Sequence, residues 1–133
     1  MQNSAAEKRA GGRPVAQMIF LVLAWLTFGC VTVQTFIAGM AVFTNPNHWE
    51  THTTFVHLFE FLPLLMVIFA FAGKLSSALR WQSTAIFLLI IAQYATANIP
   101  SAGAVHPVIA LVMFWLTLTV AAQATRLIRR RDA

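Results

Sequence analysis

The chain has 133 residues, of which 59% are hydrophobic and only 10% are charged, and its mean hydropathy is +0.72. A soluble domain carries about a quarter charged residues, so this composition excludes a water-soluble globular protein and predicts one integral membrane domain. The net charge of +5 falls in short clusters beside apolar segments, which favours a membrane-topology signal over nucleic-acid binding.

Apolar segments separated by short polar turns predict four membrane-spanning helices, since roughly 20 residues cross the hydrocarbon core. We expect a cytoplasmic tail at 1–13, a membrane domain at 14–128 with spans near 15–43, 50–73, 80–98 and 104–127, and a basic tail at 129–133. Pro14 suits the first turn of the first helix, and Pro63 is expected to bend the second. The single cysteine, Cys30, excludes an internal disulfide and a multi-cysteine metal site.

All nine Lys and Arg residues lie in the two tails, in the central turn between the second and third spans, or at the span ends next to them. The positive-inside rule therefore predicts that both termini are cytoplasmic, in a bacterial inner membrane. The predicted fold is an all-α bundle of two helical hairpins. Each hairpin carries a glutamine on its rising helix (Gln34, Gln93) and a histidine on its descending one (His57, His106). This similarity between the two hairpins predicts a parallel internal repeat that brings the two histidines face to face.

Polar side chains within the spans gather near the outer ends of the helices. They are Gln34, Thr35, His57, Glu60, Gln93, Tyr94, Asn98 and His106. His52 and His57 are five residues apart, which separates them by about 140° around a helix, so they cannot both face the bundle axis. We expect His57 and Glu60, three residues apart, to point inward, with His48 and His52 nearer the rim.

Three ligand chemistries fit these side chains. A haem b group would take His57 and His106 as paired axial ligands, with Gln34 and Gln93 beside it. A zinc or iron site would use His57, His106 and Glu60, with His52 as a further ligand. A proton or quinone site would use His57, Glu60 and Tyr94 without metal. The alternative is a non-catalytic subunit or assembly factor, in which the polar layer only packs helices or docks a partner.

The Gln/His pattern resembles one four-helix half of haem A synthase, and also small bacterial four-span membrane proteins of unknown function. The residues that carry the resemblance are Gln34, Gly39, His57, Gln93 and His106. It implies that His57 and His106 are haem ligands. The synthase has a glutamate one turn before the second-helix histidine, where this chain has Thr54, and Glu60 follows one turn after instead. The resemblance therefore implies the haem pocket rather than the oxidising activity.

The sequence thus predicts a membrane haem b protein for electron transfer, haem handling or redox sensing, and favours a non-enzymatic role without deciding it. Its expected partners are the lipid bilayer, a redox partner or larger membrane complex, and a second copy of the chain; no nucleic acid is expected. The choice between His52 and His57 as ligand stays open, because the start of the second helix is uncertain by several residues.

Overall fold

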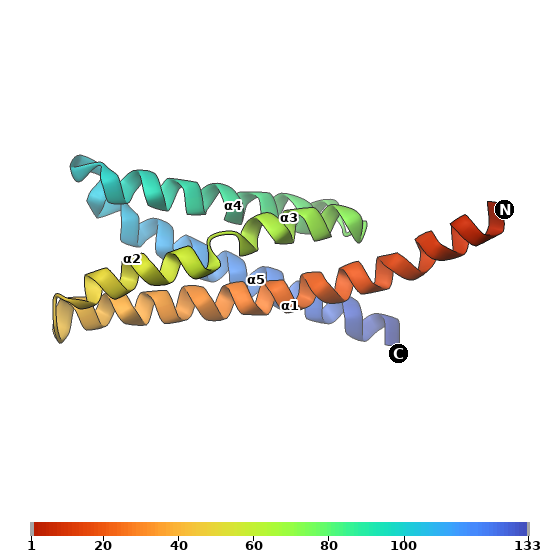
Figure 1. The fold of residues 1–133 in the computed structure, drawn as a ribbon, viewed down its shortest axis with the longest axis horizontal. Helices are drawn as coiled ribbons and strands as arrows, with labels where there is room; N and C mark the ends of the chain where they lie inside the picture. Colours follow the sequence, from red (N-terminus) through yellow and green to blue (C-terminus); the bar gives the residue numbers. More distant parts are fainter. Residues whose placement is uncertain (1, 133) are drawn as a thin grey trace.

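A computed structural model describes residues 2–132, and this part of the chain is helical with no β-strand. Its elements are α1 (Gln2–Phe43), α2 (His48–Phe59), α3 (Leu62–Ala72), α4 (Ser77–Asn98), the short 3₁₀ helix η1 (Pro100–Val105) and α5 (His106–Asp132). Because α2 and α3 follow one another as a single broken rod, the chain forms four helical rods (Figure 1). The predicted all-α fold is confirmed.

The four rods pack in a ring, each against two neighbours. Helix α1 lies against α5 on one side and against α2 and α3 on the other, while α4 lies between α3 and α5. Consecutive rods run in opposite directions, so the two termini lie at the same end of the bundle as the turn between α3 and α4 (Figure 1). We call this the terminal end (12–17, 70–80 and 124–130), and the opposite end the polar end (34–60 and 93–106).

Helix α1 begins earlier than the sequence predicts. The polar segment expected as a separate tail continues the helix back to Gln2, so Pro14 lies inside α1 rather than in its first turn. The alanine, glutamate, lysine and arginine residues at 5–9 are good helix formers, which favours this extension. The predicted basic tail likewise continues α5 to Asp132, and Met1 and Ala133 lie outside the described residues.

The second rod is broken between α2 and α3 at Glu60 and Phe61. Pro63 stands in the first turn of α3, where its missing N–H is tolerated. The same missing donor leaves the carbonyl of Phe59 without its usual partner four residues on, which stops α2 from continuing. The sequence predicts a bend at this proline, and the structure has a full interruption that places Glu60 at the break.

The interior of the bundle is apolar and closely packed. Its fully buried large side chains are Phe20, Met66, Ile86 and Val120, and its buried small ones include Ala24, Ala70, Ala121 and Ala124. Three buried hydroxyls, on Thr27, Ser83 and Thr117, each donate to the carbonyl four residues earlier. These polar groups are therefore satisfied within their own helices.

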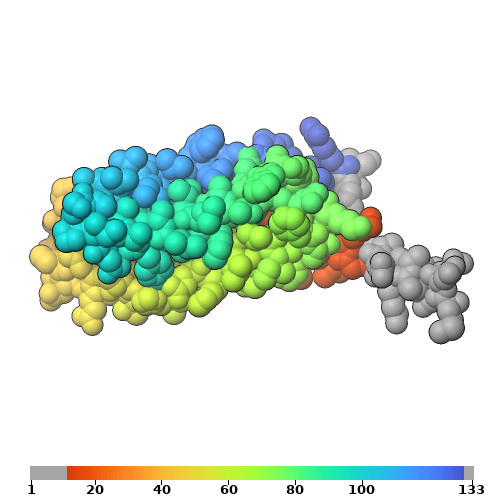
Figure 2. Space-filling view, turned by 90° about the horizontal axis from the view of Figure 1, so that it is seen from above, coloured from red at the N-terminus to blue at the C-terminus, as the bar shows by residue number. Residues whose placement is uncertain are grey.

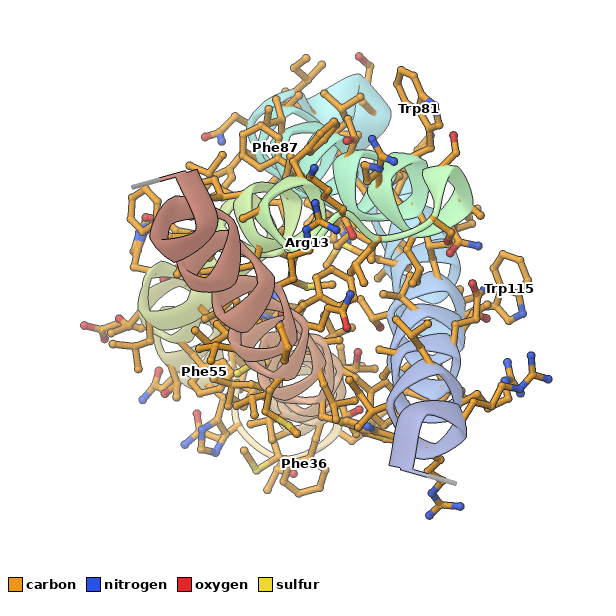
Figure 3. The ribbon with its side chains drawn as sticks, turned by 90° about the vertical axis from the view of Figure 1, so that its right-hand side faces the viewer. Arg13, Phe36, Phe55, Trp81, Phe87 and Trp115 are labelled. Atoms are coloured by element: carbon orange, nitrogen blue, oxygen red, sulfur yellow. The ribbon has the colours of Figure 1, made fainter. Side chains whose placement is uncertain are left out.

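The outer surface is also apolar, as the outward-pointing Phe36, Trp81 and Trp115 illustrate (Figure 3). Within the described chain, three helical stretches are long and apolar enough to cross a membrane. They are Gly12–Phe43, His48–Ala72 and Pro100–Arg130. Helix α4 is not among them, because polar residues such as Arg80, Gln82 and Gln93 lower its hydropathy. Length and composition thus support three of the four predicted spans.

Candidate functional site

Two histidines from different hairpins meet at the polar end. His52 on α2 and His106, the first residue of α5, have ring centroids 6.4 Å apart with the ring planes inclined at 58°. Both residues are half-buried. The Trp49 ring packs edge-on against His52 at 5.5 Å between centroids. His52 and His106, called the histidine pair below, therefore bridge α2 and α5.

Gln34 on α1 supports the histidine pair from the side of the first helix. Its Nε2 donates to the backbone carbonyl of His52 at 2.9 Å, which ties α2 to α1 at this level. Gln34 Oε1 and His52 Nδ1 are both buried and have no hydrogen-bond partner within residues 2–132. An unpaired buried polar atom is costly, and most such atoms in proteins bond to water or a ligand. The pair is therefore incomplete as a purely structural contact.

Helix α4 supports His106 from the opposite side. His106 Nδ1 lies 3.2 Å from the backbone carbonyl oxygen of Gln93 and 3.2 Å from Thr96 Oγ1. A carbonyl oxygen only accepts, so a hydrogen bond to it places the proton on Nδ1. The lone pair of the ring is then on Nε2. A backbone carbonyl that fixes the tautomer in this way is the usual second contact of a metal-binding histidine.

The side-chain amide of Gln93 distinguishes the two tautomers of His106. When its nitrogen faces the ring, the amide donates to Nδ1 at 2.9 Å and its oxygen accepts from the Ala110 N–H at 3.2 Å. That orientation requires an unprotonated Nδ1 and moves the proton to Nε2. This orientation satisfies both ends of the amide. The carbonyl of Gln93 and its side-chain amide thus favour different tautomers of His106.

A second polar cluster joins α2 to α4 and consists of His57, Glu60 and Tyr94, which we call the carboxylate cluster. The Tyr94 hydroxyl donates to Glu60 Oε2, and His57 Nδ1 lies 3.3 Å from the same oxygen. The Tyr94 hydroxyl is also 3.2 Å from His57 Nδ1, and the two rings stack with centroids 6.1 Å apart. Each of the three side chains therefore contacts the other two.

The carboxylate cluster lies on the outer surface of the bundle, unlike the histidine pair. The His57 side chain is 61% exposed and that of Glu60 is 22% exposed, and both are flanked by the exposed apolar residues Leu58 and Phe61. Glu60 also stands at the middle of the apolar stretch His48–Ala72. An ionisable group at such a position is expensive in lipid unless it has partners, and Tyr94 and His57 provide them.

Residues 34–99, just under half of the chain, match the model of a family of unknown function (DUF6220). The matched segment contains Gln34, His52, the carboxylate cluster and Gln93, and it ends before His106. No similar curated protein and no similar solved structure was found. The resemblance to one half of haem A synthase therefore stays a prediction.

The predicted pairing of His57 with His106 is corrected by the structure, in which the ring beside His106 is that of His52. The five-residue spacing does turn the two α2 histidines to different sides, as expected. The side that faces α5 is the one with His52, because α2 ends at Glu60 and packs along α1 through Gln34. His57 faces Tyr94 on α4 instead.

The predicted zinc or iron site is also divided between the two clusters. His52 lies with His106, whereas His57 lies with Glu60. Across the part of the chain that the structure describes, no group of three or more His, Cys, Asp or Glu side chains could hold a metal ion. Both predicted glutamines do lie beside the histidine pair.

Two contacts of the histidine pair are missing from the sequence-based prediction. Thr96 lies one turn after Gln93, on the same helix face, and this spacing is the signal that could have placed it beside His106. Trp49 fits equally well in an interfacial aromatic belt, so the sequence gives no reason to place it on His52. Of the remaining predicted polar residues, Thr35 and Asn98 are exposed and bond within their own helices.

Proposed function

We propose that this protein binds haem b at the histidine pair, with His52 and His106 as the residues that would hold it. The observation that carries the proposal is the separation of the two rings. Two imidazoles that both bind one metal ion, each at about 2 Å, have ring centroids up to roughly 6 Å apart. The observed 6.4 Å is close to this value.

The donor set favours haem over a bare metal ion. Two imidazoles are too few to hold zinc or non-haem iron, which take three or four protein ligands. A porphyrin supplies the other four ligands, so two histidines complete the coordination of its iron. The unpaired His52 Nδ1 would provide one nitrogen donor, and His106 would provide the other through Nε2 when its proton is on Nδ1.

The proposed setting is the inner membrane of a bacterium, with four spans and both termini in the cytoplasm. The support is the distribution of cations, because Arg13, Lys74, Arg80, Arg126 and Arg130 all belong to segments of the terminal end. The positive-inside rule places this end in the cytoplasm and the histidine pair near the outer face. In this proposal α4 also crosses the membrane, since Ser83 is buried and Gln82 and Gln93 are half-buried in the bundle.

The proposed role is electron transfer, since a bound haem supplies a one-electron iron couple. The chain itself holds the ligands in place: Gln34 fixes the backbone at His52, and the Gln93 carbonyl lies 3.2 Å from His106 Nδ1. With two histidines holding the iron, a bound haem would supply electron transfer rather than oxygen chemistry. The electrons would be exchanged with a redox partner or a larger membrane complex.

The test is the absorption spectrum of the full-length protein purified in detergent from cells with ample haem. Wild type should show a Soret band and, after reduction, the α and β bands of a bis-histidine haem. His52→Ala and His106→Ala should each lose more than nine-tenths of the haem at equal protein yield. His57→Ala and His48→Ala are matched controls that should keep it. A haem content that falls with His57→Ala and not with His52→Ala would support the sequence-based pairing of His57 with His106. It would refute the pairing of His52 with His106.

A second candidate function is favoured by the mutual contacts of the carboxylate cluster. Glu60, Tyr94 and His57 could accept a proton from a quinol head group that reaches them from the lipid. This candidate predicts that purified wild-type protein carries extractable quinone. Glu60→Gln should lose that quinone, while its Soret band stays unchanged. Quinone content that is equal in the two proteins would exclude this role.

A further inference from the structure

An open groove lies at the terminal end of the bundle, between the start of α4 and the last turns of α5. Its volume is about 230 Å³. Its lining residues are Ser76, Leu79, Gln123, Arg126, Leu127 and Arg130. Figure 2 shows these two segments side by side, with the start of α4 in green and the end of α5 in blue. The groove lies at the opposite end of the bundle from the histidine pair, and neither histidine lines it.

The basic side of the groove is built by the helical spacing of α5. Gln123, Arg126 and Arg130 are three to four residues apart, so their side chains share one face of the helix. Leu127 lies on the same face, and Leu79 of α4 lies opposite. The groove thus combines two guanidinium groups with apolar walls.

The two arginines of the groove have no ion pair among the side chains described at 12–130. Arg80, on the neighbouring helix, differs from them. Its Nε donates to the Leu75 carbonyl at 2.8 Å and its guanidinium lies over the Phe71 ring. Arg80 is therefore held by the protein, whereas Arg126 and Arg130 retain their full hydrogen-bonding capacity for an external anion.

The start of α4 adds to the positive character of the groove. Ser76 caps this helix, accepting from the Leu79 N–H at 3.3 Å, and the first N–H groups of a helix favour negative charge. Guanidinium groups bind phosphate through paired N–H donors. Basic pockets between helices at the cytoplasmic membrane face are suited to lipid head groups for the same reasons.

We propose that this groove binds the phosphate of one anionic phospholipid, with Arg126 and Arg130 as its ligands. The apolar walls and the adjoining apolar outer surface of α4 and α5 select a lipid over a free phosphate, because acyl chains continue along that surface. The inference rests on the proposed membrane location and orientation, which put the groove at the cytoplasmic leaflet. It does not depend on haem.

The test is native mass spectrometry of the delipidated full-length protein in detergent, titrated with phosphatidylglycerol or with phosphatidylcholine. Wild type should bind one phosphatidylglycerol in preference to phosphatidylcholine. Arg126→Gln/Arg130→Gln should bind it about 30-fold more weakly, since each cation near an anionic lipid contributes roughly a factor of five. Arg129→Gln removes a neighbouring exposed charge that does not line the groove, and this control should bind as wild type does.

Three results would overturn the proposal. They are equal binding by the double variant, equal binding of the two lipids, and displacement of the lipid by millimolar inorganic phosphate. The thermal unfolding of each variant is measured in parallel, and the surface position of both arginines predicts no change. A wild-type protein without a Soret band would refute the haem proposal and leave the lipid result standing, so the two failures are distinguishable.

Discussion

The two ends of the bundle are held together by different interactions. At the terminal end, backbones approach closely: the Gly73 carbonyl accepts from Gln17 Nε2 of α1 at 2.9 Å, and Gly73 itself is buried. At the polar end, α2 packs along α1, and its links to α4 and α5 pass through the rings of Tyr94 and His106. One end therefore depends on packing and the other on polar side chains.

This difference indicates where a ligand can be accommodated. A closely packed region resists change because every displaced atom loses many contacts. A region joined by a few hydrogen bonds opens at lower free energy, and binding sites are commonly drawn from such regions. The break at Glu60 separates the two kinds of contact within one rod, since α3 runs from the break to the terminal end and α2 lies at the polar end.

Replacing a core phenylalanine near the closely packed terminal end should have the largest effect on stability. Phe20 is 0% exposed, so Phe20→Ala leaves a cavity and should lower the free energy of unfolding by about 3 kcal/mol. Phe36, on the same helix but 66% exposed, is the matched control, and Phe36→Ala should change it by less than about 0.5 kcal/mol. Reversible unfolding in mixed detergent micelles measures both. Equal losses would contradict the assigned packing of α1.

The close approach at Gly73 should be the next most sensitive feature. A Cβ atom there would lie 3.0 Å from the Phe69 carbonyl oxygen and 3.1 Å from Gln17 Cγ. Gly73→Ala should therefore destabilise the protein by about 1–2 kcal/mol, as overpacking does. At Gly39 an added Cβ meets nothing within 4 Å, so Gly39→Ala should be neutral or stabilising by up to about 1 kcal/mol. The same unfolding measurement compares them, and stabilisation by Gly73→Ala would disprove the tight contact.

Much of the structure of the terminal end can be predicted from the sequence. Long apolar runs predict the helices, and clusters of cations predict where those helices end. The effect of Pro63 is also predictable, although the sequence does not tell a bend from a break. It is harder to predict from the sequence which of His52 and His57 faces α5. Each residue turns a helix by about 100°, so an error of two or three residues in the start of α2 exchanges the side chains that face α5.

At the polar end, the sequence therefore predicts which residues are present, but not which of them contact one another. Gln93 lies beside His106, and Gln34 bonds to His52. The depth at which Gln34 meets α2 depends on the length of the connecting turn and on the crossing of two helices. Neither can be obtained from the periodicity of one chain, which is why His52 and not His57 is the histidine bonded at its backbone to Gln34.

The smallest expected effect concerns the bond between Tyr94 and Glu60 that joins α2 to α4. Tyr94→Phe removes this donor and leaves the carboxylate with His57 as its neighbour, so it should destabilise the wild-type protein by about 1 kcal/mol. Glu60→Leu removes the group that needs a partner and should be neutral or stabilising, as replacement of costly buried charges often is.

The decisive measurement is the double-mutant cycle on these two residues, by unfolding in mixed micelles. In the Glu60→Leu background, Tyr94→Phe should leave the free energy of unfolding almost unchanged, because no carboxylate remains that would lose its hydrogen-bond donor. Glu50→Leu, which removes the exposed carboxylate in the first turn of α2, is the control background and should leave the cost of Tyr94→Phe unchanged. An equal loss of stability from Tyr94→Phe in the wild-type, Glu60→Leu and Glu50→Leu backgrounds would mean that Tyr94 acts through packing alone. The polar end would then be held together in the same way as the terminal end.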